Sequence, residues 1–294
     1  MRLLHPLVAA AAIFAVAGPA AQEPTVVFKS GVERVAVAAI VRDSRGRLVK
    51  DLQARDFELF DNGRARPLVS VWSEPSPASV AILVDASGSM ATKIERARDA
   101  ARTLVAGLKP GADEVAYYTF DTMLQQVRPF SKDFSIADTP LEGAKAYGAT
   151  SLWDAIADTA RHVSDRQMRR AMVVITDGVD SASRMKPSAV SAIASELDVP
   201  VYILVISFSL EDDQREPPEI HGPLADLAMW TGGDSLVVRD IETAATATTQ
   251  ILSELHHQYV IAFEPGAAPG WHPLVVRTRN PGLFVRARSG YTVK

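Results

Sequence analysis

The stretch SVAILVDASGS, residues 79–89, decides how this chain folds. Its uninterrupted apolar run, Val80 to Val84, is typical of a strand buried on both faces, as in a parallel sheet covered by helices. The polar loop Asp85-Ala86-Ser87-Gly88-Ser89 follows the run at once. Because ligands of open α/β sheets bind at the carboxyl ends of the strands, this loop is the first candidate for a functional site.

Downstream of this loop, predicted helices alternate with predicted strands. Residues 93–108 carry apolar side chains at three- and four-residue steps, and Thr92-x-x-Glu95 predicts a capping box at the start of a helix. Further apolar strands are expected near 113–120, 171–175 and 201–206, with helices between them. This alternation predicts a doubly wound α/β fold with a mostly parallel sheet.

The two flanks of this region have a different pattern, with short strands and turn residues. In the first flank, Asn62-Gly63 predicts a tight hairpin, since both residues tolerate positive φ. The segment Glu74-Pro75-Ser76-Pro77 marks a boundary, and strand patterns return after His257. We therefore expect the α/β domain, residues 77–255, to be inserted in a small antiparallel β-sandwich formed by residues 22–76 and 256–294.

The first 21 residues have the layout of a secretory signal peptide: one early cation, Arg2, an apolar run, and small residues before Gln22. The run is shorter than the ~20 apolar residues of a membrane-spanning helix, so no transmembrane segment is expected after cleavage. The protein is then periplasmic or secreted. Its 294 residues contain no cysteine, which excludes disulfides and thiolate chemistry, and its formal charge of −4 makes nucleic acid an unexpected partner.

Two more polar loops are expected at the same edge of the sheet as Asp85. Thr150 lies in GATS, just before a predicted helix, and Asp177 lies in ITDG, just after a predicted strand. Each loop alone has an ordinary explanation as a helix cap or turn. Together, the three loops bring carboxylate and hydroxyl oxygens to one place, and these are the ligands that hard divalent cations prefer.

The three loops resemble the metal-ion-dependent adhesion site of the von Willebrand factor type A domain, in the motifs DASGS (85–89), GATSLWDA (148–155) and ITDG (175–178). The resemblance implies a metal site formed by Asp85, Ser87, Ser89, Thr150 and Asp177. It implies Mg²⁺ as the ion, with Mn²⁺ or Ca²⁺ as alternatives. The flanking segments DFELFDNGRARPLVSV (56–71) and LFVRARSGY (283–291) are similar to a group of bacterial exported proteins with such domains.

Other candidate sites have simpler explanations. Ser87 and Ser89 lack the G-x-S-x-G elbow of a hydrolase nucleophile, so no catalytic residue is predicted. His256 and His257 are adjacent on a helix and point in different directions, which disfavours a shared metal. Two pairs of alternating arginines are interpreted as solvated sheet faces, with an anionic partner as the alternative: Arg277 with Arg279, and Arg286 with Arg288. Asp180 with Glu211, Asp212 and Asp213 is a weaker candidate for an auxiliary calcium site.

The leading hypothesis is an exported adhesion or scaffold protein that is not an enzyme. Its cation would bind an Asp or Glu carboxylate of a partner protein, because hydroxyls and few carboxylates leave the ion with positive charge. One rival is an accessory subunit that recruits or activates a metal-dependent enzyme in the cell envelope. Another is a purely structural role with a vestigial site. The sequence predicts neither the partner nor the oligomeric state.

Overall fold

The α/β part of the protein is built on one six-stranded sheet. The computed structural model describes residues 34–135, 141–143, 145–207 and 222–293. The sheet order is β10-β9-β8-β5-β6-β7, and every neighbouring pair is parallel except β6 with β7. The strands are β5 (Ala78–Asp85), β6 (Glu114–Phe120), β7 (Leu124–Ser131), β8 (Arg169–Thr176), β9 (Val201–Ile206) and β10 (Ser235–Val238).

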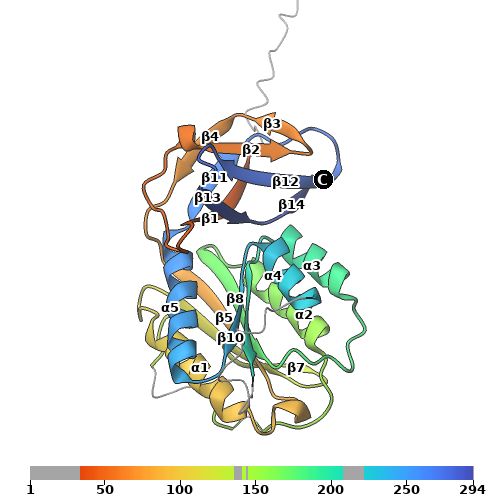
Figure 1. Cartoon of the computed structure of the whole chain (residues 1–294). Coiled ribbons are helices and arrows are strands. Elements are labelled where there is room, and N and C mark those ends of the chain that lie inside the picture. The colour runs from red at the N-terminus through yellow and green to blue at the C-terminus, as the bar shows by residue number, and fades with distance from the viewer. Residues whose placement is uncertain (1–33, 136–140, 144, 208–221, 294) are drawn as a thin grey trace, which may run out of the picture. The chain divides into compact units, whose positions relative to one another are not determined.

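Helices cover both faces of this sheet (Figure 1). On one face, α1 (Ile94–Ala106) and α5 (Ile241–His257) pack on side chains such as Val80 and Ile82. On the other face lie α2 (Leu152–Ser164), α3 (Pro187–Glu196) and α4 (Pro223–Thr231), packed on Ala81 and Leu83. All eight residues of β5 are buried. The predicted doubly wound α/β fold with a mostly parallel sheet is confirmed.

The start of α1 differs from the prediction. The predicted apolar stripe is buried, but the N-cap is Lys93, in helical conformation and without a side-chain cap. A short 3-10 helix, Gly88–Met90, leads into α1, and the Met90 carbonyl accepts a hydrogen bond from the Lys93 N–H at 2.8 Å. Because α1 begins after Lys93, one residue later than the pattern predicts, the predicted Thr92-x-x-Glu95 capping box is wrong.

Strands from both flanks of the chain form two four-stranded antiparallel sheets. The first has the order β13-β1-β11-β4 and the second β14-β12-β2-β3. The N-terminal flank supplies β1 (Val35–Asp43), β2 (Phe57–Asp61), β3 (Arg64–Arg66) and β4 (Leu68–Trp72), with a 3-10 turn at Ala54–Asp56. The C-terminal flank supplies β11 (Tyr259–Phe263), β12 (Gly270–Thr278), β13 (Leu283–Ala287) and β14 (Gly290–Val293).

A separate core of apolar side chains, including Leu59, Ile261 and Phe263, joins these strands. The predicted hairpin joins β2 to β3, where Asn62 has φ 51° and Gly63 has φ 75°.

The described residues lie in one compact unit, Glu33–Lys294, so the boundaries predicted at residues 76 and 255 stay predictions. The predicted signal peptide lies outside the described residues. Within the described part of the chain, no helix has the length and apolarity needed to cross a membrane.

Arginines of β13 and its C-terminal extension bind the α/β part, which corrects one prediction. Arg286 forms ion pairs with Asp234, at 2.6 Å, and with the fully buried Glu254 of α5. Arg288 lies 3.2 Å from Asp198. The prediction of a solvated face for this pair is wrong, because these guanidiniums neutralise acidic side chains of the same chain. On β12 and just after it, Arg277 lies over the Phe60 ring and Arg279 pairs with Glu58 on the surface.

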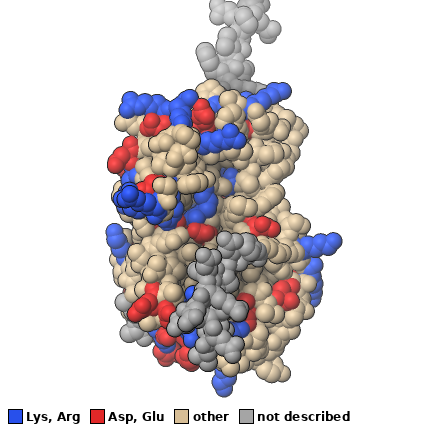
Figure 2. All heavy atoms as spheres, in the orientation of Figure 1, with Lys and Arg blue, Asp and Glu red and all other residues tan. Residues whose placement is uncertain are grey.

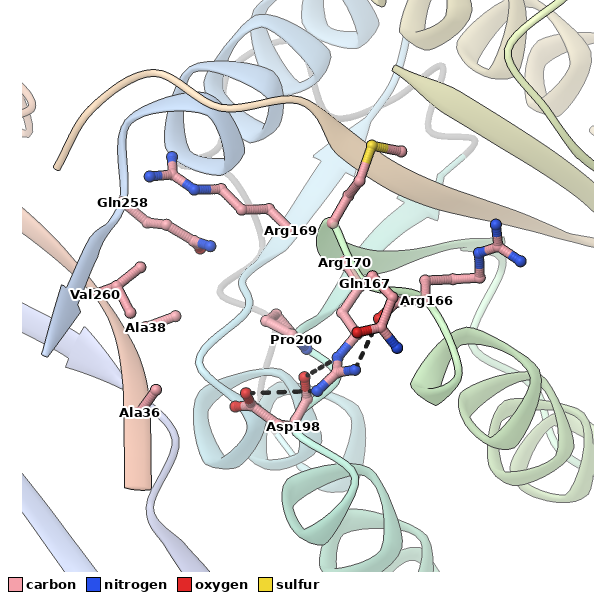
Figure 3. Close-up of a pocket in the computed structure, with 11 residues that line it drawn as sticks. Ala36, Ala38, Arg166, Gln167, Arg169, Arg170, Asp198, Pro200, Gln258 and Val260 are labelled. Atoms are coloured by element: carbon pink, nitrogen blue, oxygen red, sulfur yellow. Dashed lines mark hydrogen bonds and ion pairs between the residues drawn. The ribbon is translucent and has the colours of Figure 1, made fainter. Parts of the chain in front are cut away.

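A cavity of about 330 Å³ lies where the amino ends of β8 and β9 approach β1 and β11 (Figure 3). Arg169 donates hydrogen bonds to the carbonyls of Leu255 and His256 at the end of α5. Arg170 donates to the Ser164 carbonyl at the end of α2. Cations at helix C-termini compensate the unpaired carbonyls and the helix dipole. Arg169 and Arg170 therefore hold helix ends, at the edge of the sheet opposite the predicted metal site.

A buried ion pair links β2 to β12. The Nδ1 of His272 lies 2.6 Å from an oxygen of Asp61, and its Nε2 lies 2.7 Å from the Ala268 carbonyl. Both neighbours are acceptors, so the protonated imidazole, in which both ring nitrogens donate, fits this position best. The hydrogen bond to Asp61 raises the pKa of His272. Burial acts to raise the pKa of Asp61, but hydrogen bonds from His272 and the Gly266 N–H outweigh it and lower that pKa.

We predict that His272 stabilises the protein more at low than at high pH. A raised folded-state pKa means that the contribution is complete below the ordinary value of 6.5 and is lost as the pH rises through the folded-state value. Near pH 6, His272→Gln should reduce the free energy of unfolding by about 1.5–3 kcal/mol, as expected for a hydrogen bond to a charged group. Denaturant unfolding at several pH values up to about pH 9 should show this difference shrinking. A difference that stays constant would contradict the assigned protonation.

Candidate metal centre

The three predicted loops meet at the carboxyl edge of the six-stranded sheet. Asp85 ends β5, Asp177 follows β8, the parallel neighbour of β5, and Thr150 precedes α2. The first two loops are joined by backbone hydrogen bonds: the Gly88 N–H donates to the Gly148 carbonyl at 2.9 Å, and the Tyr147 N–H donates to the Ala86 carbonyl at 2.8 Å. A Cβ added at Gly88 would lie 3.2 Å from the Gly148 oxygen. Glycine thus permits the close approach of the loops.

Asp85 is 0% exposed, and both of its carboxylate oxygens have partners. One oxygen accepts the Ser87 N–H at 2.9 Å, and the other accepts the Thr176 hydroxyl at 2.6 Å. Burial raises the pKa of Asp85, the hydrogen bonds oppose this, and the Asp177 charge adds to it. The carboxylate is therefore fixed in orientation. Burial disfavours its negative charge, and a nearby cation would stabilise that charge.

Ser87 and Ser89 present a pair of hydroxyls next to this carboxylate. Their Oγ atoms are 3.1 Å apart. Ser87 is buried, whereas Ser89 is exposed. One hydroxyl of the pair is therefore inside the protein and the other is at the surface. Both are neutral oxygen ligands of the kind that Mg²⁺ binds.

Thr150 is held by the loop that follows Asp177. Its N–H donates to the Ser181 hydroxyl at 2.9 Å, and its carbonyl accepts the N–H groups of Ser181 and Ala182 at 3.0 and 2.9 Å. Asp180, in the same loop, accepts the Leu152 N–H at 3.0 Å and so caps α2. The auxiliary calcium site suggested for Asp180 stays a prediction. The other residues of that hypothesis, 211–213, lie outside the described residues.

Asp177 already has a cationic partner that the sequence did not predict. One of its oxygens lies 2.8 Å from the ammonium of Lys93, and the other accepts the Val179 N–H at 3.1 Å. Lys93 is the residue just before α1 and is partly buried. The loops that follow β5 and β8 thus bring two proposed ligand carboxylates, Asp85 and Asp177, and one ammonium to this edge of the sheet.

This arrangement fits a hard divalent cation. The five predicted residues supply two carboxylates and three hydroxyls, all oxygen donors. The structure brings Asp85, Ser87 and Ser89 into one loop. The loop that contains Thr150 is hydrogen-bonded to both neighbouring loops, and the charge of Asp177 acts on Asp85. Across the residues that the structure describes, no group of three His, Cys, Asp or Glu side chains could hold a metal, so an ion at this edge would rely on the hydroxyls.

Two supporting residues were missed because their sequence signals are weak. Thr176, which binds Asp85, stands beside Asp177 in ITDG and resembles an ordinary strand end. Lys93 is one of several basic residues around α1.

The adjacent histidines His256 and His257 have separate partners. His256 lies 3.2 Å from Asp113, and the Nδ1 of His257 lies 3.0 Å from the Ser253 carbonyl.

The fold and this loop geometry define an α/β domain with an oxygen-rich site at the carboxyl edge of its sheet. Residues 80–179 match the family model of the von Willebrand factor type A domain. This segment, which contains all five predicted ligands, is a von Willebrand factor type A domain. No curated protein sequence matches the chain.

Solved structures with the same fold include the von Willebrand factor type A protein from Catenulispora acidiphila. It is 16% identical, with a TM-score of 0.50, and the match covers 82% of this chain and 75% of that one. The likeness therefore extends beyond residues 80–179, and at this identity it concerns the fold alone. The conserved hypothetical protein BatB from Bacteroides thetaiotaomicron is 22% identical, with a TM-score of 0.49, over 60% of this chain and 98% of that one. The PilB minor pilin from Streptococcus sanguinis is 15% identical, with a TM-score of 0.45, over 62% of each chain.

We predict that Lys93→Met destabilises the metal-free protein. The substitution keeps the length of the side chain but leaves the poorly exposed Asp177 carboxylate without its ammonium, in the field of Asp85. The loss should be about 1.5–3 kcal/mol, as for hydrogen bonds to charged groups. Denaturant unfolding in the presence of a chelator measures it.

The matched control is Lys109→Met, since Lys109 is exposed. A surface change of this kind should alter stability by no more than about 0.5 kcal/mol. Equal effects of the two substitutions would show that the ion pair between Lys93 and Asp177 does not stabilise the edge of the sheet.

Proposed function

We propose that this protein is an exported, non-catalytic binding or scaffold protein that recognises a carboxylate of a partner protein through a divalent cation. The observation that carries the proposal is the loop of Asp85, Ser87 and Ser89, held against Gly148 at the carboxyl edge of the sheet. Asp85, Ser87, Ser89, Thr150 and Asp177 are its proposed ligands, and Mg²⁺ is the ion that their chemistry favours.

The charges of the site support a carboxylate as the partner group. Asp85 and Asp177 are opposed by Lys93, so these side chains together compensate only part of the charge of a divalent cation. A bound ion would supply positive charge and an exchangeable coordination position that an Asp or Glu side chain can occupy. Ser89 is exposed and marks the side from which a partner can approach.

Recognition at this site depends on local chemistry. On the face shown in Figure 2, blue Lys and Arg side chains and red Asp and Glu side chains are interspersed over the described surface. Such a mixed surface gives weak long-range attraction to a partner. Affinity would then come from the contacts around the cation, as in interfaces where a few groups dominate binding.

The first test is a titration of Mg²⁺ into the metal-stripped protein, followed by calorimetry. The wild type should bind one ion, and Asp85→Asn should abolish the binding because it removes the buried charge. Ser89→Ala, at an exposed position, should weaken binding by about tenfold or more, which corresponds to about 1.4 kcal/mol. The control is Asp43→Asn. Asp43 ends β1 and pairs with the exposed Arg47, so this variant should bind Mg²⁺ as the wild type does.

The outcomes separate the candidate functions. Absence of saturable binding of both Mg²⁺ and Mn²⁺ to the wild type would contradict the proposal and leave a purely structural role. Binding by the wild type together with co-purification of an enzyme would favour the alternative, an accessory subunit of a metal-dependent enzyme in the cell envelope. Binding without such an enzyme supports adhesion or scaffolding.

A further inference from the structure

Three large apolar side chains are exposed on the segments that surround the candidate metal centre. Met123 is 70% exposed, Tyr147 80% and Val179 47%. Single exposed apolar residues are common on protein surfaces and need no explanation. These three differ because Tyr147 and Val179 lie on loops that supply a proposed metal ligand, and Met123 lies in a turn that is hydrogen-bonded to one of those loops.

Tyr147 and Val179 belong to the metal loops themselves. Tyr147 precedes Gly148, and its N–H donates to the Ala86 carbonyl, between Asp85 and Ser87, at 2.8 Å. Val179 is two residues after Asp177, and its N–H donates to the Asp177 carboxylate at 3.1 Å. Both side chains are therefore mounted within two or three residues of a proposed ligand.

Met123 lies in the turn between β6 and β7, which is tied to the same loops. The Asp121 carbonyl accepts the Ser151 N–H at 2.7 Å, and the Asp121 carboxylate accepts the Met123 N–H at 2.9 Å. Strand β6, which leads into this turn, pairs with β5, with Phe120 opposite Asp85. We call Met123, Tyr147 and Val179 the apolar rim.

We propose that the apolar rim selects partners in which the recognised Asp or Glu is flanked by large apolar side chains. This inference rests on the proposed metal-dependent function and names the class of partner segment. The proposed cation fits an anionic group, and the exposed apolar side chains on the adjoining segments fit apolar neighbours of that group. A partner segment whose recognised Asp or Glu has only polar neighbours would leave the three side chains of the apolar rim exposed to water.

Two physical arguments favour this partner. A contact between a cation and a carboxylate is stronger when water is excluded, and apolar residues around a central polar contact provide that exclusion. The rim is also preorganised, because backbone hydrogen bonds fix each of its three segments. Little ordering is then required on binding, which favours affinity.

The test uses the purified protein and a displayed peptide library with one fixed aspartate and random residues on both sides. Binding in Mg²⁺ and elution with a chelator should enrich peptides with a large apolar residue next to the aspartate. The rim variant Met123→Ser/Tyr147→Ser/Val179→Ser should bind the selected peptides at least about tenfold more weakly. The control variant Trp72→Ser/Met229→Ser/Phe284→Ser changes three exposed apolar residues away from the metal loops and should bind them as the wild type does.

Calorimetric titration of Mg²⁺ into each variant separates the two levels of the proposal. The rim variant should bind Mg²⁺ like the wild type, since its substitutions leave the five proposed ligands intact. If Mg²⁺ binds but eluted peptides show no apolar preference, or none are recovered, the rim proposal is overturned. Unchanged peptide affinity in the rim variant overturns it too. If the wild type binds no divalent cation, the proposed function itself fails, and the rim inference with it.

Discussion

The architecture of the site depends on the buried carboxylate of Asp85. Strand β5 is covered on both faces, so the residue that ends it is removed from water before any ligand is considered. A buried carboxylate must be hydrogen-bonded or neutralised, and here the Ser87 N–H and the Thr176 hydroxyl supply the hydrogen bonds. These two contacts fix the turn of the first loop and join β5 to β8. They also place the hydroxyls of Ser87 and Ser89 beside a charge that is only partly compensated.

The remaining loops converge on this carboxylate through backbone contacts that leave little freedom. Gly88 lies against Gly148, and Ser181 holds Thr150 from the other side. Lys93 brings positive charge to Asp177, so the pair of carboxylates is already partly neutralised without a metal. The β-sandwich contributes at a distance, since Arg286 pairs with Glu254 on α5 and so helps fix a helix that covers the sheet.

Most of the fold could be predicted because it follows local patterns. The run Val80 to Val84 predicts a strand that is buried on both faces, and Asn62-Gly63 predicts a hairpin. Each of these signals is contained in a few consecutive residues. The site ligands could be proposed from motif spacing, whereas their supporting contacts could not. Thr176 meets Asp85 across 91 residues of sequence and Lys93 meets Asp177 across 84, and only the packed sheet reveals such pairs.

The two wrong predictions have different origins. Helix α1 begins after Lys93, one residue later than the Thr92-x-x-Glu95 pattern predicts. Arg286 and Arg288 are instead covered by acidic groups distant in sequence, which local patterns cannot reveal.

Whether the loops at the carboxyl edge of the sheet hold a cation is decided most directly by a crystal structure of the protein grown with Mn²⁺, with anomalous scattering data. We expect one anomalous peak within ligand distance of the hydroxyls of Ser87 and Ser89. Well-ordered loops with no peak there, or a peak elsewhere, would rule out the proposed metal site.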